Sequence, residues 1–160
     1  KLDKSFRGII RYIHENEPGH HYSYLYDYAG AAWKTQKKVA KFRKRKYHNQ
    51  AFGLNGDDDC GQMSAWYIFS ALGFYPATPG SGIYAIGTPL FEEATIYPNP
   101  KDSSVAFTVI AKNVSCKNKY IQSATLNSEK LEEPFLRHSD IINGGEIIFE
   151  MGRRPKKSGW

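Results

Sequence analysis

The spacing of apolar residues changes near the middle of this 160-residue chain. Up to about residue 75, apolar positions recur every three or four residues, which predicts helices. Beyond residue 76, short apolar runs are bounded by Pro, Gly, Asn and Asp, which predicts strands. These runs are IYAIG, ATIYP, VAFTVIA, YIQSATLN and IIFEMG. We therefore predict an α+β fold, in which helices in residues 1–75 precede a β-rich, antiparallel part in residues 76–160.

Three helices are expected before the middle of the chain. Residues 1–15 predict the first, which ends before a Pro–Gly pair, and residues 24–28 predict the second, which ends near Gly30. The third would run from about residue 36 to residue 47, with Thr35 as its N-cap.

The stretch GLNGDDDCGQMSAWYIFSALGFYP predicts a fourth helix over residues 60–72, which Gly73 ends. Three aspartates precede it, and negative charge is favourable at a helix N-terminus. Capping needs only one of them. Asp57 and Asp59 are alternate residues that could face one side as a coupled pair of acids, one of which serves as a base near neutral pH. The pattern leaves capping and catalysis open.

A run of eight Lys and Arg lies within the 13 residues from Lys34 to Lys46, in a chain of net charge +6. Such a run is typical either of nucleic-acid binding or of a solvated helix face. Val39 and Phe42 form a narrow apolar stripe within it, and no zinc-finger or RNA-binding motif accompanies it. We therefore predict a surface helix and no nucleic-acid partner.

The absence of long apolar runs and the two cysteines indicate the cellular environment of the chain. No apolar run reaches the roughly 18 residues of a membrane span, so we expect no membrane contact. There is no signal peptide and no initiator Met, so we expect a fragment of a longer protein. Cys60 and Cys116 are expected to be buried free thiols, with a disulfide in an oxidising compartment as the alternative.

The segment HENEPGHH, residues 14–21, places carboxylate and amide side chains beside a Pro–Gly break. Calcium takes oxygen ligands from irregular backbone of this kind, although a simple polar turn has the same composition. Zinc binding through His20 and His21 is disfavoured, because adjacent residues of a helix point about 100° apart.

Two long stretches resemble a known family. NEPGHHYSYLYDYAGAAWKTQKKV and GLNGDDDCGQMSAWYIFSALGFYPATPGSGIYAIGTPLF are similar to the C-terminal part of bacterial exo-α-mannosidases of glycoside hydrolase family 92. NKYIQSATLN and the closing GGEIIFEMG extend the resemblance, which covers the chain from about Asn16 to its end.

The resemblance implies a calcium-dependent, inverting enzyme that removes terminal mannose from α-linked glycans. Such enzymes pair a β-sandwich domain with an (α/α)6-barrel catalytic domain, so residues 1–75 would supply the last barrel helices. By position, Asn16 and Glu17 would help to hold calcium, and Asp57 and Asp59 would be the base carboxylates. His20 and His21 would lie near the sugar. The resemblance also implies a periplasmic, cell-surface or secreted protein.

One departure from the family limits the expected activity. The family's general acid is a Glu in a segment resembling EGNxWQY, and this sequence has no such segment. We therefore expect the chain to be inactive alone. The alternative is a non-catalytic carbohydrate-binding module, or one completed by a second chain or by a homo-oligomer that covers exposed apolar surface.

Overall fold

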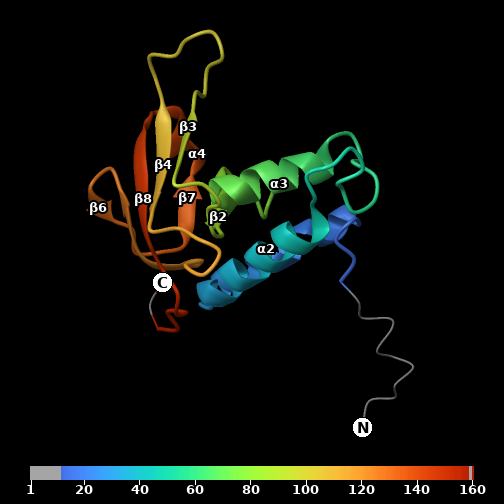
Figure 1. Ribbon diagram of the computed structural model, residues 1–160. Helices are drawn as coiled ribbons and strands as arrows, with labels where there is room; N and C mark the ends of the chain where they lie inside the picture. The colour runs from blue at the N-terminus through green and yellow to red at the C-terminus, as the bar shows by residue number, and fades with distance from the viewer. Residues whose placement is uncertain (1–11, 159) are drawn as a thin grey trace.

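A computed structural model describes residues 12–158 and 160. Within these residues, four helices come first, and a fifth short helix lies among eight strands (Figure 1). The helices are η2 (Glu17–Tyr24, a 3-10 helix), α1 (Leu25–Tyr28), α2 (Ala32–Lys46), α3 (Gln62–Leu72) and α4 (His138–Ile142). The strands are β1 (Phe74–Tyr75), β2 (Ile83–Ile86), β3 (Glu93–Ile96), β4 (Phe107–Lys112), β5 (Tyr120–Leu126), β6 (Glu129–Lys130), β7 (Phe135–Arg137) and β8 (Gly145–Gly152). The predicted α+β class is confirmed.

The strands form two sheets beside the helical layer (Figure 1). The larger sheet has the order β3-β4-β8-β5-β6, and the smaller has the order β1-β2-β7. All paired strands are antiparallel except β4 and β8, which run parallel. The glycine turn before β8 leads out of α4 rather than out of a neighbouring strand, and this connection makes the parallel pairing possible.

The period-two pattern of β4 produces the core of the larger sheet. Phe107 and Val109 are buried on one face, while Thr108 and Ile110 are half-buried on the other. In β8 the same alternation buries Ile147, together with Phe149 and Met151. One buried face and one partly solvated face is the usual arrangement of a largely antiparallel sheet.

A second, aromatic core lies between the helices. Trp66 of α3 is fully buried and stacks on Tyr47, with ring centroids 5.7 Å apart and an interplanar angle of 4°. Its indole N–H donates to the backbone carbonyl of His20, 3.1 Å away. The tryptophan therefore ties η2, α3 and the end of α2 into one packed unit.

Arg43 of α2 joins this helix to α3 and to the segment that follows β2. Although it belongs to the basic run, it is buried, and its Nη1 donates to the carbonyls of Ser70 (2.6 Å) and Thr88 (2.7 Å). The other basic residues of α2 are exposed or half-buried. The prediction of a surface helix is confirmed for the run as a whole, but it is wrong for Arg43, since a carbonyl cluster solvates its charge in place of water.

Three local predictions are corrected. Helix α2 begins at Ala32, so Thr35 is a buried residue inside the helix and not its cap. Helix α3 begins at Gln62, after Gly61 in the left-handed region. Cys60 and Cys116 are free but exposed, so the prediction of burial is wrong for both. Both lie in loops outside the helices and strands, and loops run over the protein surface.

Most of the helix predicted over residues 1–15 lies outside the described residues, and residues 12–16 form a turn rather than a helix. Among the described residues, none of the helices has the length and apolarity that crossing a membrane requires.

Candidate functional site

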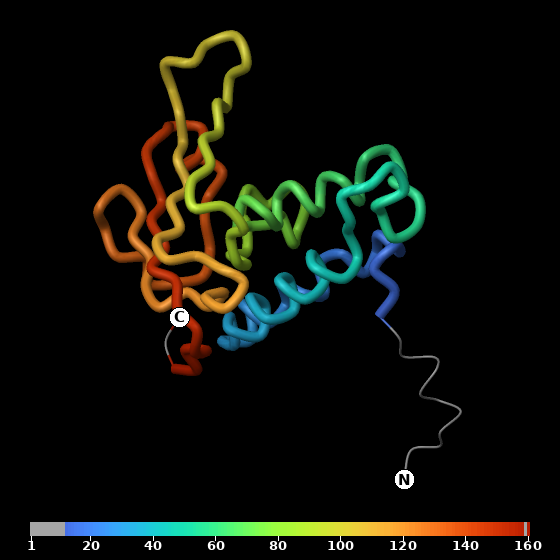
Figure 2. The backbone as a smooth tube through the Cα atoms, viewed as in Figure 1, coloured from blue at the N-terminus to red at the C-terminus, as the bar shows by residue number. Residues whose placement is uncertain are grey.

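The two segments singled out in the sequence meet in space. Asn55 Nδ2 donates to Glu15 Oε2, 2.5 Å away, across a separation of 40 residues. Gly56 has a φ of +96°, and a Cβ there would lie 2.7 Å from Cβ of Glu15, so only glycine fits. Figure 2 shows the loop before α3 beside the first described residues. The turn of residues 13–17 therefore packs against the loop that carries the three aspartates.

This packing brings Glu17 into contact with Asp59. A hydrogen bond to the Glu17 carboxyl raises the pKa of Asp59, and the neighbouring charges of Asp57 and Asp58 raise it further. The pKa of Glu17 is lowered, first by a hydrogen bond to its own backbone and then by the one from Asp59. The carboxyl groups of Glu17 and Asp59 are therefore neighbours, and the side chain of Asp59 is exposed.

The three aspartates divide the roles that the sequence left open. Asp58 accepts from the backbone N–H of Ser64 (2.8 Å) and from its hydroxyl (3.0 Å). Its own backbone carbonyl accepts from the N–H of Gly61 and of Met63. Since Gly61 offers no side chain to the first turn of α3, Asp58 acts as the cap. Asp57 and Asp59 are exposed and remain available for chemistry.

Because Asp58 caps α3 and Asp57 does not, replacing each with alanine should have unequal effects on stability. Asp58→Ala should lower the free energy of unfolding by about 1 kcal/mol, because it leaves the backbone N–H and the hydroxyl of Ser64 without their acceptor. Asp57→Ala removes the same charge from an exposed position and should change stability by less than about 0.5 kcal/mol. Urea unfolding of the two variants measures the difference. Equal losses would contradict the assignment of the cap to Asp58.

His20 and His21 face different surroundings. The imidazole of His20 is buried, and its Nε2 donates to the carbonyl of His14, 2.7 Å away, so Nδ1 is the acceptor for the side-chain amide of Gln62 at 3.3 Å. Burial lowers the pKa of His20, which keeps the ring neutral. His21 is half-buried and packs edge-on against Tyr22. His20 therefore fixes the turn against α3, and His21 is the more accessible ring.

His14 is a site-supporting residue that the sequence did not reveal. Tyr47 donates its hydroxyl to the carbonyl of Met63 (3.1 Å), so His14 Nε2 donates to Tyr47 (2.8 Å), and His14 Nδ1 accepts from Tyr12 (2.7 Å). Burial lowers the pKa of His14 to about 3. A neutral, fully bonded histidine thus anchors the chain just before Asn16. Its local sequence resembles that of any polar turn, which is why no pattern indicates it.

The chemistry available at the site is that of hard oxygen donors. Asn16 is exposed beside Glu17, and the carboxyl group of Asp59 is a neighbour of the Glu17 carboxyl. Carboxylate and amide oxygens of this type are ligands that calcium takes in proteins. Within residues 12–158 and 160, no group of three His, Cys, Asp or Glu side chains is arranged to hold a metal ion. The donor type fits calcium, while backbone, water or sugar oxygens would have to complete the six to eight ligands that calcium takes.

Comparisons with known proteins identify the family of the chain. Residues 1–153 match the glycosyl hydrolase family 92 catalytic domain. The chain belongs to this family of glycoside hydrolases. Over 164 aligned residues it is 30% identical to an uncharacterized secreted glycosidase of Arthroderma benhamiae, covering all of this chain and 20% of that protein.

Solved structures give the same result. A family GH92 alpha-mannosidase from Bacteroides thetaiotaomicron superposes with a TM-score of 0.84 at 40% identity, over 90% of this chain and 19% of that one. A family GH92 inverting mannosidase from the same organism has a TM-score of 0.84 at 39% identity, over 94% and 20%. The chain thus spans about a fifth of the length of these relatives.

Proposed function

We propose that this chain carries the catalytic-base side, and part of the calcium site, of an inverting exo-α-mannosidase. The packing of the turn of residues 13–17 against the aspartate loop carries the proposal, because it joins the two motifs to which the resemblance assigns these roles. The mannosidases among the similar structures support the substrate class, a terminal α-mannoside. The origin of residues 1–75 in an (α/α)6 barrel, with residues 76–160 as the β-rich part, belongs to the same proposal.

Asp57 and Asp59 would act as the base. An inverting glycosidase needs a carboxylate that takes a proton from the water attacking the anomeric carbon. The two residues flank Asp58, whose bonds to Ser64 hold the loop against the rigid start of α3. This anchoring keeps both carboxylates at one place while they stay open to water and sugar. His21 and, through its position on the turn, His20 would border the sugar.

Asn16 and Glu17 would hold calcium. When bound, calcium would grip mannose hydroxyls and favour a distorted sugar ring. The chain's own contribution is the rigid turn: His14 and His20 are both buried and hydrogen-bonded, which fixes the backbone on either side of the two donors. Preorganised donors of this kind lose little freedom on binding.

The general acid must come from outside these 160 residues. In an inverting enzyme it lies roughly 6.5–9.5 Å from the base and protonates the leaving oxygen. General acid catalysis contributes about 10²–10⁴-fold to the rate. We therefore expect no calcium-dependent hydrolysis of 4-nitrophenyl α-mannoside by this chain. Specific turnover by the chain alone would contradict this part of the proposal.

Calorimetric titration with calcium tests the site directly. We expect the chain to bind calcium with a Kd of about 10⁻⁴–10⁻³ M, the range of extracellular calcium modules. Glu17→Gln, which keeps the shape of the side chain, should weaken binding by at least about tenfold because a charged ligand is lost. Asp57→Asn should retain binding, since Asp57 is assigned to the base.

Glu133→Gln is the matched control, because Glu133 is exposed in the β-rich part. It removes the same charge and should leave calcium binding unchanged. Equal affinities of the Glu17→Gln and wild-type chains would contradict the role of Glu17, and an absence of binding at millimolar calcium would show that the described donors do not suffice.

One observation favours the second candidate, a binding module completed by another chain. Tyr22, Leu25 and Tyr28 recur every third residue along η2 and α1, and their side chains are 53%, 47% and 52% exposed. An apolar row of this kind is typical of a surface that another polypeptide covers. A molar mass that rises with protein concentration in light scattering would support a homo-oligomer. Tyr28→Gln should then return the molar mass to that of the monomer. The secreted relative supports a protein that acts outside the cytoplasm.

A further inference from the structure

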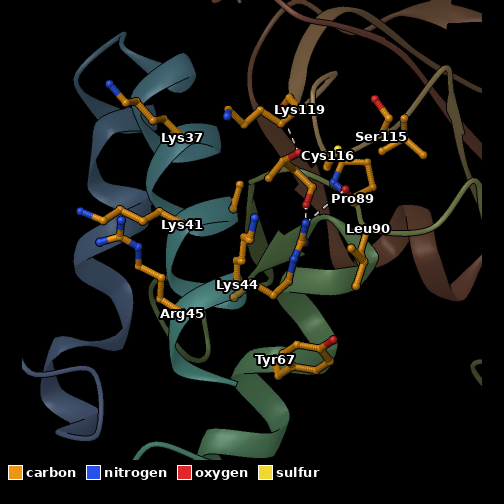
Figure 3. Close-up of a pocket in the computed structure, with 14 residues that line it drawn as sticks. Lys37, Lys41, Lys44, Arg45, Tyr67, Pro89, Leu90, Ser115, Cys116 and Lys119 are labelled. Carbon is orange, nitrogen blue, oxygen red and sulfur yellow. Dashed lines mark hydrogen bonds between the residues drawn. The ribbon is translucent and has the colours of Figure 1, made fainter. Parts of the chain in front are cut away.

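A hollow lies away from the first turn of α3 and from the aspartate loop. It has a volume of about 560 Å³ and lies between α2, α3, the segment after β2 and the loop before β5 (Figure 3). Ser70, whose carbonyl is bonded to Arg43 at its floor, follows Gln62 by eight residues, which is about 12 Å along the helix. The hollow is therefore separate from the aspartate loop.

The walls of this hollow are strongly basic. Its lining includes six Lys or Arg side chains and no Asp or Glu. They are Lys37, Lys41, Arg43, Lys44, Arg45 and Lys119. In the part of the chain that the structure describes, the salt bridges are Lys112–Glu150 and Lys130–Glu132, and neither is at this hollow. The positive charges here are thus not balanced by carboxylates.

Two of these cations come from different walls of the hollow. Figure 3 shows Lys44 rising between α2 and the Pro89 segment, while Lys119 extends from the opposite wall toward α2. Arg43 adds a buried charge beneath them, held by the carbonyls of Ser70 and Thr88. The ends of Lys37, Lys41 and Arg45 extend along the outer side of α2 and make the surroundings positive (Figure 3).

The remaining wall is apolar and aromatic. Tyr67, Leu90 and Val114 line the hollow beside the cations. Small-molecule sites combine such apolar walls with a few polar groups, within volumes of roughly 300–1,000 Å³. We propose that this hollow binds a phosphomonoester of sugar size, with the phosphate between Lys44 and Lys119 and the organic part against Tyr67.

Calorimetry with mannose 6-phosphate tests this assignment. The titration is run with a chelator, so that binding at the proposed calcium site does not contribute. The double variant Lys44→Gln, Lys119→Gln should bind about tenfold more weakly, because two charge contacts are lost. The matched control Lys101→Gln, Lys130→Gln removes the same net charge from exposed positions elsewhere and should bind as the wild type does. Added salt should weaken wild-type binding.

The two exposed thiols provide an independent readout in the same molecule. Cys116 lines the hollow, whereas Cys60 lies in the aspartate loop. Mannose 6-phosphate should slow the alkylation of Cys116 several-fold and leave that of Cys60 unchanged. Far-UV circular dichroism confirms that each variant is folded.

Four outcomes would overturn the proposal. The first is equal affinity of the two double variants, and the second is equal protection of both cysteines. The third is binding of inorganic phosphate as tight as that of mannose 6-phosphate, which would indicate an unspecific anion site. The fourth is a single-stranded oligonucleotide that binds through Lys44 and Lys119 while the sugar phosphate does not, which would assign the hollow to nucleic acid. Failure of calcium binding elsewhere leaves all of these readouts unaffected.

Discussion

Replacing Trp66 with alanine is expected to lower the free energy of unfolding by about 3–5 kcal/mol. The side chain is fully buried, stacks on Tyr47, and donates its indole N–H to the carbonyl of His20. The substitution leaves a cavity where the helices meet and removes the partner of a buried carbonyl. Equilibrium unfolding in urea, followed by circular dichroism, measures the loss.

Ile68→Ala is the control for this prediction. Ile68 belongs to the same helix but is 57% exposed, so its truncation should change stability by less than about 0.5 kcal/mol. Because Trp66 holds the backbone of His20, calcium affinity should fall with Trp66→Ala and not with Ile68→Ala. A loss of under about 1 kcal/mol for Trp66→Ala would contradict the helical core described above.

Asp27→Asn is expected to stabilise the chain, and increasingly so as the pH rises. Asp27 is 4% exposed, and burial raises the pKa of its carboxyl from 3.8 to about 8. Neither carboxyl oxygen has a hydrogen-bond partner within bonding distance among the described residues, although the nearby Thr35 hydroxyl offsets part of the shift. The folded chain therefore holds a proton that the unfolded chain releases near pH 4.

Between pH 4 and 8 the folded state binds one more proton at Asp27 than the unfolded state does, so wild-type stability falls as the pH rises. Asparagine is neutral in both states and removes this dependence. The stability difference between variant and wild type should grow by about 3 kcal/mol from pH 5 to pH 7.5.

Thermal or urea unfolding across this pH range measures the difference. Asp102→Asn is the control, because hydrogen bonds to Ser104 lower the pKa of this exposed carboxyl. Asp102 is therefore ionised in both states above pH 5, and its variant should run parallel to the wild type. Parallel curves for Asp27→Asn as well would contradict a buried, protonated Asp27.

The apolar pattern of the sequence determined the fold class and most strands. Alternation in β4 correctly separates Phe107 and Val109 from Thr108 and Ile110, because side chains on a strand point to opposite faces with period two. Gly73, at φ +106°, ends α3 as predicted, since only glycine adopts that conformation without strain. Local rules of this kind need no knowledge of distant residues.

The sequence also identified the family, because the two long motifs contain enough specific residues to do so. It could not distribute roles among Asp57, Asp58 and Asp59. Which carboxylate caps α3 depends on where the loop places it relative to Ser64, and the contact of Asp59 with Glu17 depends on packing across about 40 residues. Sequence spacing carries no information about either distance.

Burial was the other property that the tertiary structure decided. Arg43 and Lys44 are neighbours in one basic run, yet the first is buried against backbone carbonyls and the second is exposed in the basic hollow. Thr35, predicted as an N-cap, is buried inside α2, whereas Cys60 and Cys116, predicted to be buried, are exposed. Local pattern determines which element forms, but the neighbours supplied by distant elements determine which of its side chains lose water, and therefore which of its charges can do chemistry.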